Sequence, residues 1–285
     1  MRLPLRLRAV ALALAAAACV PPIPDNDELV SFDEVTVMGE IQGAGTLVVG
    51  LPDDVGDPWV GFATAVARDI GESLGVDLEF QSHPNEDLVG LVDAGSIDVG
   101  FPVLTITEQL VRKHAFSDPI YVGHQRLVVP ADAGVETVED LTGEVCSPVD
   151  DATGVELHEL EPSLSTVPLR PGNAEGCVPL LEDGLVSSAT APDVLLATIM
   201  SELPDGYEVT GEQLTTEPLA VALERGASGW VDYVNKVITE FDQEGRWAAA
   251  YEEHLGTHLG GPTPEPPNMT LEEAAALFPA DLAEI

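Results

Sequence analysis

Segments with the pattern of β-strands alternate with segments of helical periodicity along most of this chain. Residues 46–50, of sequence TLVVG, are expected to form a buried strand, and residues 61–74 follow as a helix with one apolar face. Two more short strands are expected at residues 78–80 and 97–101, with a helical segment between them. Because strands that alternate with helices form a sheet covered by helices, this order predicts an α/β lobe.

The alternation begins again after residue 130. A strand at residues 125–129 leads into this part, and a short capped helix and a further strand opening at residues 145–147 follow. Late in the chain, residues 219–223 have the pattern of a strand, and an apolar helical stripe runs from Trp230 to Phe241 after it. The sequence therefore predicts two α/β lobes.

The first residues indicate export. Three arginines precede the apolar run at residues 9–18, which is too short to span a bilayer but suits the middle of a signal peptide. We therefore expect residues 1–18 to be cleaved. Cys19 follows three alanines in a sequence that resembles the lipobox of bacterial lipoproteins, which implies a lipid anchor on the outer face of the cytoplasmic membrane. Cleavage without lipid, which gives a secreted protein, stays open.

The chain is strongly acidic, with 50 Asp and Glu residues against 11 Lys and Arg residues and a formal net charge of −39. Such a surface repels nucleic-acid phosphates, because neutralising them takes clustered Lys and Arg side chains. We therefore exclude nucleic acid as a partner. With 45% hydrophobic residues, the 285-residue chain can still bury one large core or two smaller ones.

Proline-rich segments flank the part that is expected to fold. Residues 19–43 begin with a proline-led acidic stretch and are expected to be a tether. Residues 257–285 are a proline-rich extension, in which Thr270 offers a capped start to a short helix.

A series of short motifs lies in a fixed order between residues 45 and 256. They are GTLVVG at 45–50, GF at 61–62, GSIDV at 95–99, TIT at 105–107, FSDPIY at 116–121, VEDLTG at 138–143, EPLAV at 217–221 and GRW at 245–247. In their order and spacing the chain resembles bacterial solute-binding family 3, the extracellular solute-binding proteins of polar amino-acid ABC transporters. The resemblance is strongest to the glutamate-type members of Gram-positive bacteria.

This resemblance implies a fold, a ligand site and partners. The fold is periplasmic-binding-protein-like of type II, an α/β architecture in which two crossing strands join the two lobes. With this fold we expect the first lobe at residues 44–125 and 219–256 and the second lobe at residues 126–218. A small polar or amino-acid-like solute is held in the cleft between the lobes, which close over it by hinge motion, and an ABC permease at the membrane receives it. The resemblance also implies a monomer that uses no cofactor.

Two cysteines, Cys146 and Cys177, remain after Cys19. An oxidising compartment favours their pairing over two stable free thiols. The glutamate-type relatives carry cysteines at both places, so the resemblance implies a disulfide between them. Two buried free thiols are the alternative.

Two positions depart from the family pattern. Relatives hold the carboxylate of an amino acid with an arginine three residues after the TIT motif, where this chain has Leu110. They hold the ammonium group with an aspartate where this chain has Pro192. Arg112 and Asp193 are candidate substitutes, although residues two apart on a helix face different directions. We therefore expect the usual clamps to be lost and the cleft to favour a less zwitterionic, cationic solute.

Six residues are expected to line the cleft: Asp53, Trp59, Thr105, Asp151, Thr153 and Asp193. Trp59 lies where relatives place an aromatic platform, and a role in the core is the alternative. Thr105 and Thr153 match family positions that bind a carboxylate, or they cap helix starts instead. Asp53 is more often a turn former than a ligand.

Other functions are weaker predictions. His254 and His258 have i, i+4 spacing but lack the glutamate of helical zinc sites, so we expect no metal. Loss of the clamps leaves a non-transporting sensory or scaffold module as an alternative function. An enzyme on this scaffold is the least favoured, because it needs a cleft acid or base with a shifted pKa, and we expect no catalytic residue.

Overall fold

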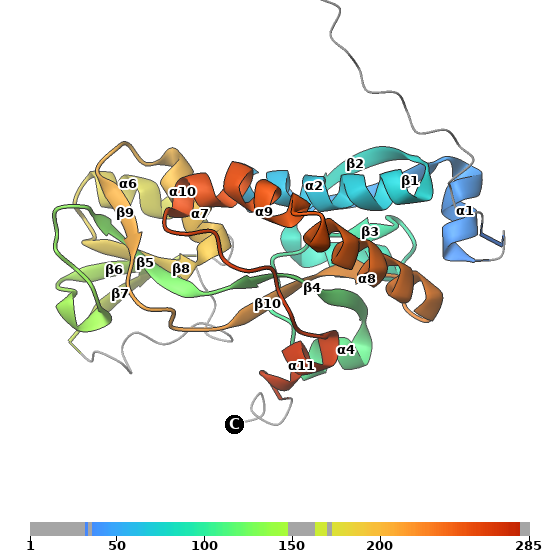
Figure 1. Ribbon diagram of the computed structural model, residues 1–285. Coiled ribbons are helices and arrows are strands. Elements are labelled where there is room, and N and C mark those ends of the chain that lie inside the picture. Colours follow the sequence, from blue (N-terminus) through green and yellow to red (C-terminus); the bar gives the residue numbers. More distant parts are fainter. Residues whose placement is uncertain (1–31, 34–35, 148–162, 170–172, 280–285) are drawn as a thin grey trace, which may run out of the picture.

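Two five-stranded sheets form the framework of the protein (Figure 1). The computed structural model describes residues 32–33, 36–147, 163–169 and 173–279. The first sheet has the order β2-β1-β3-β10-β4 and consists of β1 (Thr46–Pro52), β2 (Asp77–His83), β3 (Val99–Gly100), β4 (Ala115–Gly123) and β10 (Glu217–Leu223). The second sheet has the order β7-β6-β8-β5-β9 and consists of β5 (Gln125–Pro130), β6 (Glu144–Ser147), β7 (Ser165–Pro168), β8 (Ser188–Pro192) and β9 (Tyr207–Thr210).

Both sheets have the same plan. In the first sheet, β1 pairs in parallel with β2 and β3, and β10 lies antiparallel between β3 and β4. In the second sheet, β6 pairs in parallel with β7 and β8, and β5 lies antiparallel between β8 and β9. The predicted two α/β lobes are therefore confirmed, and each is centred on one sheet.

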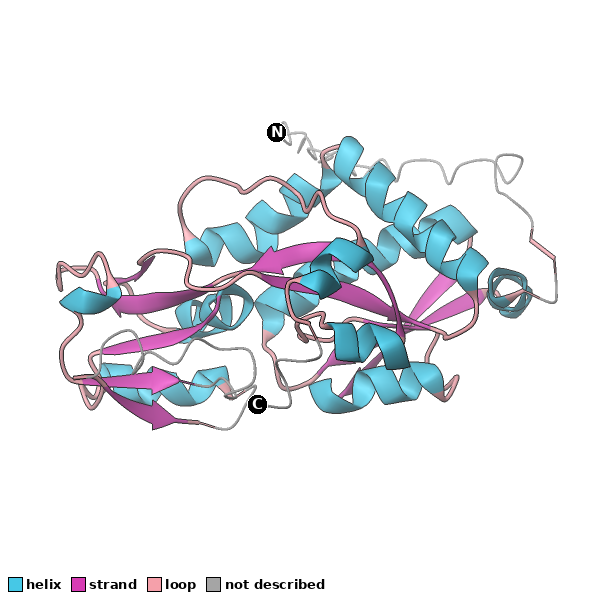
Figure 2. Ribbon diagram, turned by 90° about the horizontal axis from the view of Figure 1, so that it is seen from below, coloured by secondary structure: helices cyan, strands magenta, loops and turns pink. Residues whose placement is uncertain are grey.

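Helices pack on both sheets (Figure 2). The first lobe carries α1 (Val37–Ala44), α2 (Asp57–Leu74), α3 (Leu88–Asp93), α4 (Glu108–Lys113), α8 (Ser228–Gln243), α9 (Arg246–Tyr251), α10 (Thr257–Leu259) and α11 (Leu271–Ala276), and the second carries α6 (Cys177–Glu182) and α7 (Asp193–Glu202). Short 3-10 turns lie at Asn85–Asp87, Val138–Asp140 and Ala174–Gly176, and a π-helical turn lies at Glu252–Gly256. Within the described part of the chain, no helix is both long and apolar enough to cross a membrane.

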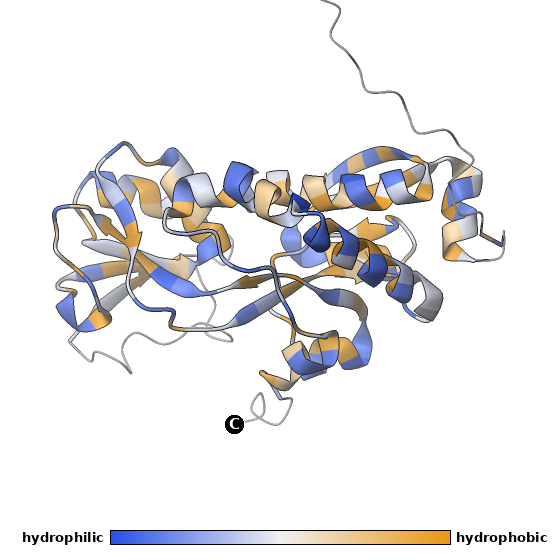
Figure 3. Ribbon diagram, in the orientation of Figure 1, coloured by the Kyte–Doolittle hydropathy of each residue, from blue (hydrophilic) through white to orange (hydrophobic). Residues whose placement is uncertain are grey.

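The two long helices fold as their apolar periodicity predicts. In α2, Phe62, Val66 and Ile70 are buried on one face, and the helix ends at Gly75, which adopts a left-handed φ of 72°. In α8, the predicted stripe begins at the buried Trp230. Hydrophilic and hydrophobic bands alternate along both helices in Figure 3, as amphipathic helices require.

The chain crosses between the lobes twice. β4 ends at Gly123 and β5 begins at Gln125, so that a single residue, His124, separates a strand of the first sheet from a strand of the second. The chain returns through residues 211–216, between β9 and β10. Figure 1 shows β4, β5 and β10 as one long band through the middle of the molecule. The two crossing strands of the predicted fold are therefore present.

The helix α1 corrects the prediction of a tether over residues 19–43. The Thr36 hydroxyl caps α1 by accepting a hydrogen bond of 3.1 Å from the N–H group of Gly39. Met38 and Ile41 are buried in the core of the first lobe. The end of this segment is therefore folded, because apolar side chains three residues apart give the helix a face to bury. Cys19 and the predicted signal peptide at residues 1–18 lie outside the described residues.

The C-terminal extension packs on the first lobe. From α10, residues 260–270 pass over β4, and α11 then lies beside α4 (Figure 1). Thr270 and Glu273 form a capping box, as the sequence predicts. Ala274 and Ala275 are buried in the same apolar cluster as Ile106.

The predicted disulfide is confirmed. Cys146 lies in β6 and Cys177 is the first residue of α6, with their Cα atoms 5.7 Å apart and the bond formed across 31 residues of sequence. Both cysteines are fully buried. The bond therefore joins a strand and a helix of the second lobe.

Replacing both cysteines by alanine is expected to lower the free energy of unfolding by about 3 to 4 kcal/mol, because the unfolded chain then loses a closed loop of this length. Urea unfolding of the oxidised wild type and the double variant measures the difference. The single variants Cys146→Ala and Cys177→Ala should each lose a similar amount, since either removes the bond. Equal unfolding free energies for wild type and double variant would contradict this role.

Candidate ligand-binding cleft

The two crossing segments are hydrogen-bonded to each other where they pass between the lobes. The ring Nδ1 of His124 lies 2.7 Å from the backbone oxygen of Thr215, and the N–H group of Gln125 donates to the Thr215 hydroxyl over 2.8 Å. That hydroxyl donates in turn to the carboxylate of Glu217 over 2.6 Å. These bonds hold the two crossings in one register, so that the lobes share a defined hinge.

Asp193, the first residue of α7, is bound to this hinge from the second lobe. Its carboxylate accepts a hydrogen bond from the N–H group of His124, and its own N–H group donates to the His124 oxygen over 3.0 Å. The residue is 6% exposed. Burial raises the pKa of Asp193 to about 6, although the N–H group of His124 and the charges of His124 and Arg126 oppose the rise. Asp193 is therefore a carboxylate that is costly to keep charged.

Two tyrosines face Asp193 from the first lobe. Burial and the charge of Asp193 raise the pKa of Tyr121, and the same two causes raise that of Tyr251 to about 12. Both hydroxyls therefore keep their protons at neutral pH. Their rings stack at 6.3 Å, and Trp247 stacks on Tyr251 at 5.5 Å.

The sequence prediction of the site did not include these tyrosines. Tyr121 ends the FSDPIY motif and Tyr251 lies 130 residues later, so that nothing local in the sequence relates either one to Asp193. The one available signal was the position of Tyr121 at the end of a strand that leads into a crossing.

Trp59 lies in the core and not on the surface of a cleft. Its side chain is fully buried, and its indole N–H donates to the backbone oxygen of Phe101 over 3.0 Å. Phe62 and Tyr121 pack against its ring, with centroids at 5.7 and 6.2 Å. The structure therefore favours the core role that the sequence left open for Trp59 over the aromatic platform.

Thr105 is buried and does not cap the neighbouring helix, and its role in a cleft stays a prediction. The helix-capping role belongs to Thr107, whose hydroxyl accepts a hydrogen bond of 3.3 Å from the N–H group of Leu110. The hydroxyl of Thr105, which is 7% exposed, has no hydrogen-bond partner among the described residues. Its loop is held against β10 by a bond of 2.9 Å from the Ile106 N–H group to the Pro218 oxygen.

Asp53 and Asp54 follow β1 but differ in environment. The Asp54 carboxylate accepts a hydrogen bond of 2.9 Å from the N–H group of Asn85 and so acts as a turn former. The Asn85 side chain exchanges two hydrogen bonds with the backbone of Val103. Asp53 is exposed and lines a pocket beside α7, described next.

A pocket of about 650 Å³ lies between the lobes on the side of α2 and α7. Its acidic and histidine side chains are Asp53, Asp57, Glu175, Glu202, Glu253, His254 and His258. The second lobe provides Glu175 and Glu202, and the first lobe provides the rest. No set of three or more His, Cys, Asp or Glu side chains in the described residues is arranged to hold a metal ion.

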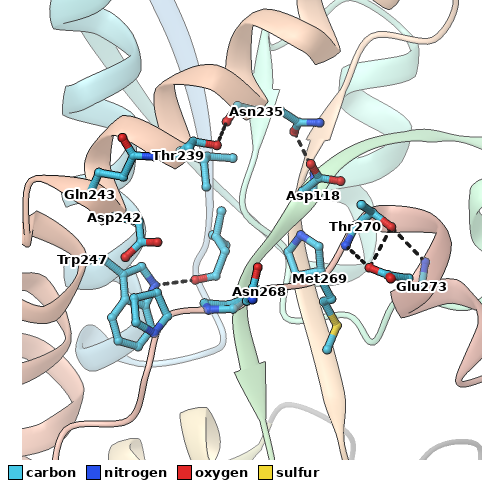
Figure 4. A pocket seen from close by; sticks show the side chains of 15 residues that line it. Asp118, Asn235, Thr239, Asp242, Gln243, Trp247, Asn268, Met269, Thr270 and Glu273 are labelled. Atoms are coloured by element: carbon cyan, nitrogen blue, oxygen red, sulfur yellow. Dashed lines mark hydrogen bonds between the residues drawn. The ribbon is translucent and has the colours of Figure 1, made fainter.

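A smaller pocket of about 330 Å³ lies under the C-terminal extension (Figure 4). Asn235, Thr239 and Asp242 of α8 line one side of it, and Asn268 and Met269 of the extension line the other. It lies on the first lobe alone, away from Asp193, and so is separate from the hinge.

The positions of the usual clamps are occupied as follows. Leu110 packs on the apolar cluster that contains Ile106 and Ala274. The Arg112 side chain is 65% exposed and pairs with Glu108 over 2.8 Å. Pro192 is the residue before α7. Asp151 and Thr153 lie outside the described residues.

Comparison with known proteins agrees with this arrangement of two lobes and a hinge. Residues 51–257 match the family of bacterial extracellular solute-binding proteins, family 3. The chain belongs to this family. Its fold is that of the type II periplasmic binding proteins, as the sequence predicts.

Several relatives are named binding proteins. The chain is 23% identical over 238 residues to the ABC transporter glutamine-binding protein GlnH of Bacillus subtilis (strain 168), covering 82% of this chain and 83% of the relative. It is 25% identical over 241 residues to the L-cystine-binding protein TcyJ of Escherichia coli (strain K12), covering 80% and 90%. An ancestral cationic amino acid solute-binding protein has the same fold with a TM-score of 0.68 at 23% identity, covering 77% of this chain and 100% of that one.

The substitution Asp193→Asn is expected to stabilise the protein at neutral pH. The folded-state pKa of Asp193 is about 6, against an ordinary value of 3.8 for an aspartate carboxyl. The stability that the protonated group contributes is therefore present below about pH 4 and is lost as pH rises through 6. An asparagine side chain does not titrate, so its contribution to stability does not change between about pH 4 and pH 7. The free energy of unfolding of the variant relative to wild type should therefore rise by about 2 to 3 kcal/mol between pH 4 and pH 7, measured by urea unfolding.

Asp69, whose pKa burial also raises to about 6, is present in both proteins and cancels in this difference. The matched control is Asp53→Asn, at an exposed aspartate, which should change stability little at either pH. A difference between Asp193→Asn and wild type that does not change with pH would contradict the assignment.

Proposed function

We propose that this protein is the substrate-binding component of an ABC importer. It binds a small solute in the cleft between its lobes and delivers it to a permease at the membrane. Membership of the solute-binding family and the binding proteins named among its relatives support this function. The hinge built from His124 and Thr215 supplies the motion that capture and release require. We propose that it works as an exported monomer, anchored through a lipid on Cys19.

The preferred solute in this proposal is a small organic cation. The observation that supports it is the carboxylate of Asp193, which is buried at the hinge with neutral hydrogen-bond donors as its nearest partners. A cationic nitrogen placed beside it would form a charge-assisted hydrogen bond and would recover part of the cost of burying the charge. The proposal thus explains why a costly charge is retained at this position.

The carboxylate of a free amino acid lacks a comparable partner in this proposal. Leu110 is packed among apolar side chains, and Arg112 is exposed and paired with Glu108. The Thr105 hydroxyl could donate one hydrogen bond, but a desolvated carboxylate without a cation costs several kcal/mol. Amines without a carboxylate should therefore bind better than the corresponding amino acids.

Isothermal titration calorimetry with arginine and with agmatine, the amine formally obtained by removing the carboxylate of arginine, tests this preference. We expect agmatine to bind at least about tenfold more tightly than arginine, because one unpaired charge is removed. The substitution Asp193→Asn should weaken agmatine binding by about a hundredfold or more, since truncating one partner of a buried charge pair has an effect of this size. The control Asp132→Asn, at an exposed aspartate of the second lobe that does not line the pocket between the lobes, should leave it unchanged.

The proposal separates into two testable parts. Micromolar or tighter binding of glutamate or glutamine would contradict the preference for a cation while leaving the function of a solute-binding protein intact. Absence of any heat or thermal stabilisation across amino acids, amines, dipeptides and carboxylates would contradict the function itself, because a ligand that binds the folded state raises its stability.

A further inference from the structure

One apolar cluster includes buried side chains of both lobes. The cluster includes Val55 and Trp59 of the first lobe and Leu195 and Ile199 of the second, each at most 5% exposed. Two lobes that separate freely each need an apolar core that is complete without the other. The shared core therefore indicates that the lobes remain in contact at this place.

The helix α7 of the second lobe lies between two elements of the first, α2 and α10. Leu259, the last residue of α10, is 4% exposed and belongs to the shared core. In Figure 1, α7 lies directly beside α10 at the upper left of the molecule. The contact therefore includes a helix that begins at Thr257, the residue at which the match to the family ends.

The backbone of Gly56 lies close to α7 in this contact. A Cβ atom at Gly56 would lie 2.4 Å from Cγ2 and 2.5 Å from Oγ1 of Thr198 in α7. Thr198 is 3% exposed, so that its side chain has little room to move away. The lobes are therefore packed here as tightly as a protein interior.

Electrostatic repulsion acts against this contact. Asp57 and Glu253 of the first lobe share the neighbouring pocket with Glu175 and Glu202 of the second. Like charges on facing surfaces favour separation. That the lobes are packed together nevertheless indicates that the apolar contact outweighs the repulsion.

We propose that α2, α7 and α10 form a latch that keeps the lobes together on this side without a ligand. The latch is a third connection, in addition to the crossings at His124 and Thr215. The lobes then pivot about the latch and the crossing strands. The proposal concerns the ligand-free protein and does not depend on the identity of the solute.

Gly56→Ala tests the latch, with Gly260→Ala as a matched control. Both glycines have a positive φ with an extended ψ, at 70° and 158° for Gly56 and at 64° and −175° for Gly260. Alanine is therefore strained at both positions. A Cβ at Gly260 would meet nothing within 4 Å, whereas one at Gly56 would collide with Thr198. The difference between the variants isolates the contact between the lobes.

Pulsed electron paramagnetic resonance gives the readout in the full chain without ligand. Spin labels are placed at Glu202 and Glu253, which are exposed and belong to different lobes, and Cys19 is replaced by serine so that it does not react. Wild type and the control variant Gly260→Ala should each give one narrow distance distribution. Gly56→Ala should add a longer distance and raise the open-to-closed ratio at least about tenfold, and adding Thr198→Ala should reverse the change.

A second pair of variants keeps the test independent of backbone strain. Leu259→Asp places a charge in the shared core and should also produce the longer distance, whereas Leu277→Asp, at a leucine of the same extension that is 47% exposed, should not. Melting temperatures identify any variant that fails to fold. A broad distribution in the wild type, or equal distributions for Gly56→Ala and Gly260→Ala, would overturn the proposal.

Discussion

The passage of the chain between its lobes at His124 and Thr215 determines where the remaining elements lie. The hydrogen bond between the two crossings fixes their relative position, and the reciprocal bonds between His124 and Asp193 then attach the start of α7 to the hinge. From that point α7 runs between α2 and α10, where Thr198 meets Gly56. The hinge, the buried carboxylate and the shared core are thus successive parts of one arrangement around α7.

Asp193 shows how function and stability compete in this arrangement. Burial raises its pKa to about 6, so the free energy of unfolding is lower at neutral pH, where the group is charged. Such costs persist in folded proteins mainly where a ligand or a mechanism uses the group. In the proposed function a cationic solute offsets this cost, which makes the closed and ligand-bound state the favourable one.

Much of the fold could be predicted from the sequence because its signals are local. The buried face of α2 follows from the spacing of Phe62, Val66 and Ile70, and the capping box at Thr270 and Glu273 is visible in four residues. The pairing of Cys146 with Cys177 followed from the number of cysteines and the resemblance to relatives. These features depend little on contacts between distant parts of the chain.

The site was predicted less well because its residues meet across long separations. Trp59 was assigned to the cleft from its family position, yet it lies three residues before Phe62 on the same helical face, a spacing that indicates burial. The environment of Asp193 depends on His124, Tyr121 and Tyr251, and no periodicity relates these residues. The packing of α1 was not predicted because residues 19–43 begin with an acidic, proline-led stretch, and the apolar face of α1 at the end of this segment is short.

A crystal structure of the protein with its solute, or with agmatine, tests the central claim most directly. The account predicts a cationic nitrogen within about 3 Å of the Asp193 carboxylate, between the two lobes, with the latch around α7 unchanged. A solute bound elsewhere, or one held through its own carboxylate with Asp193 still bound only to the hinge, would contradict it.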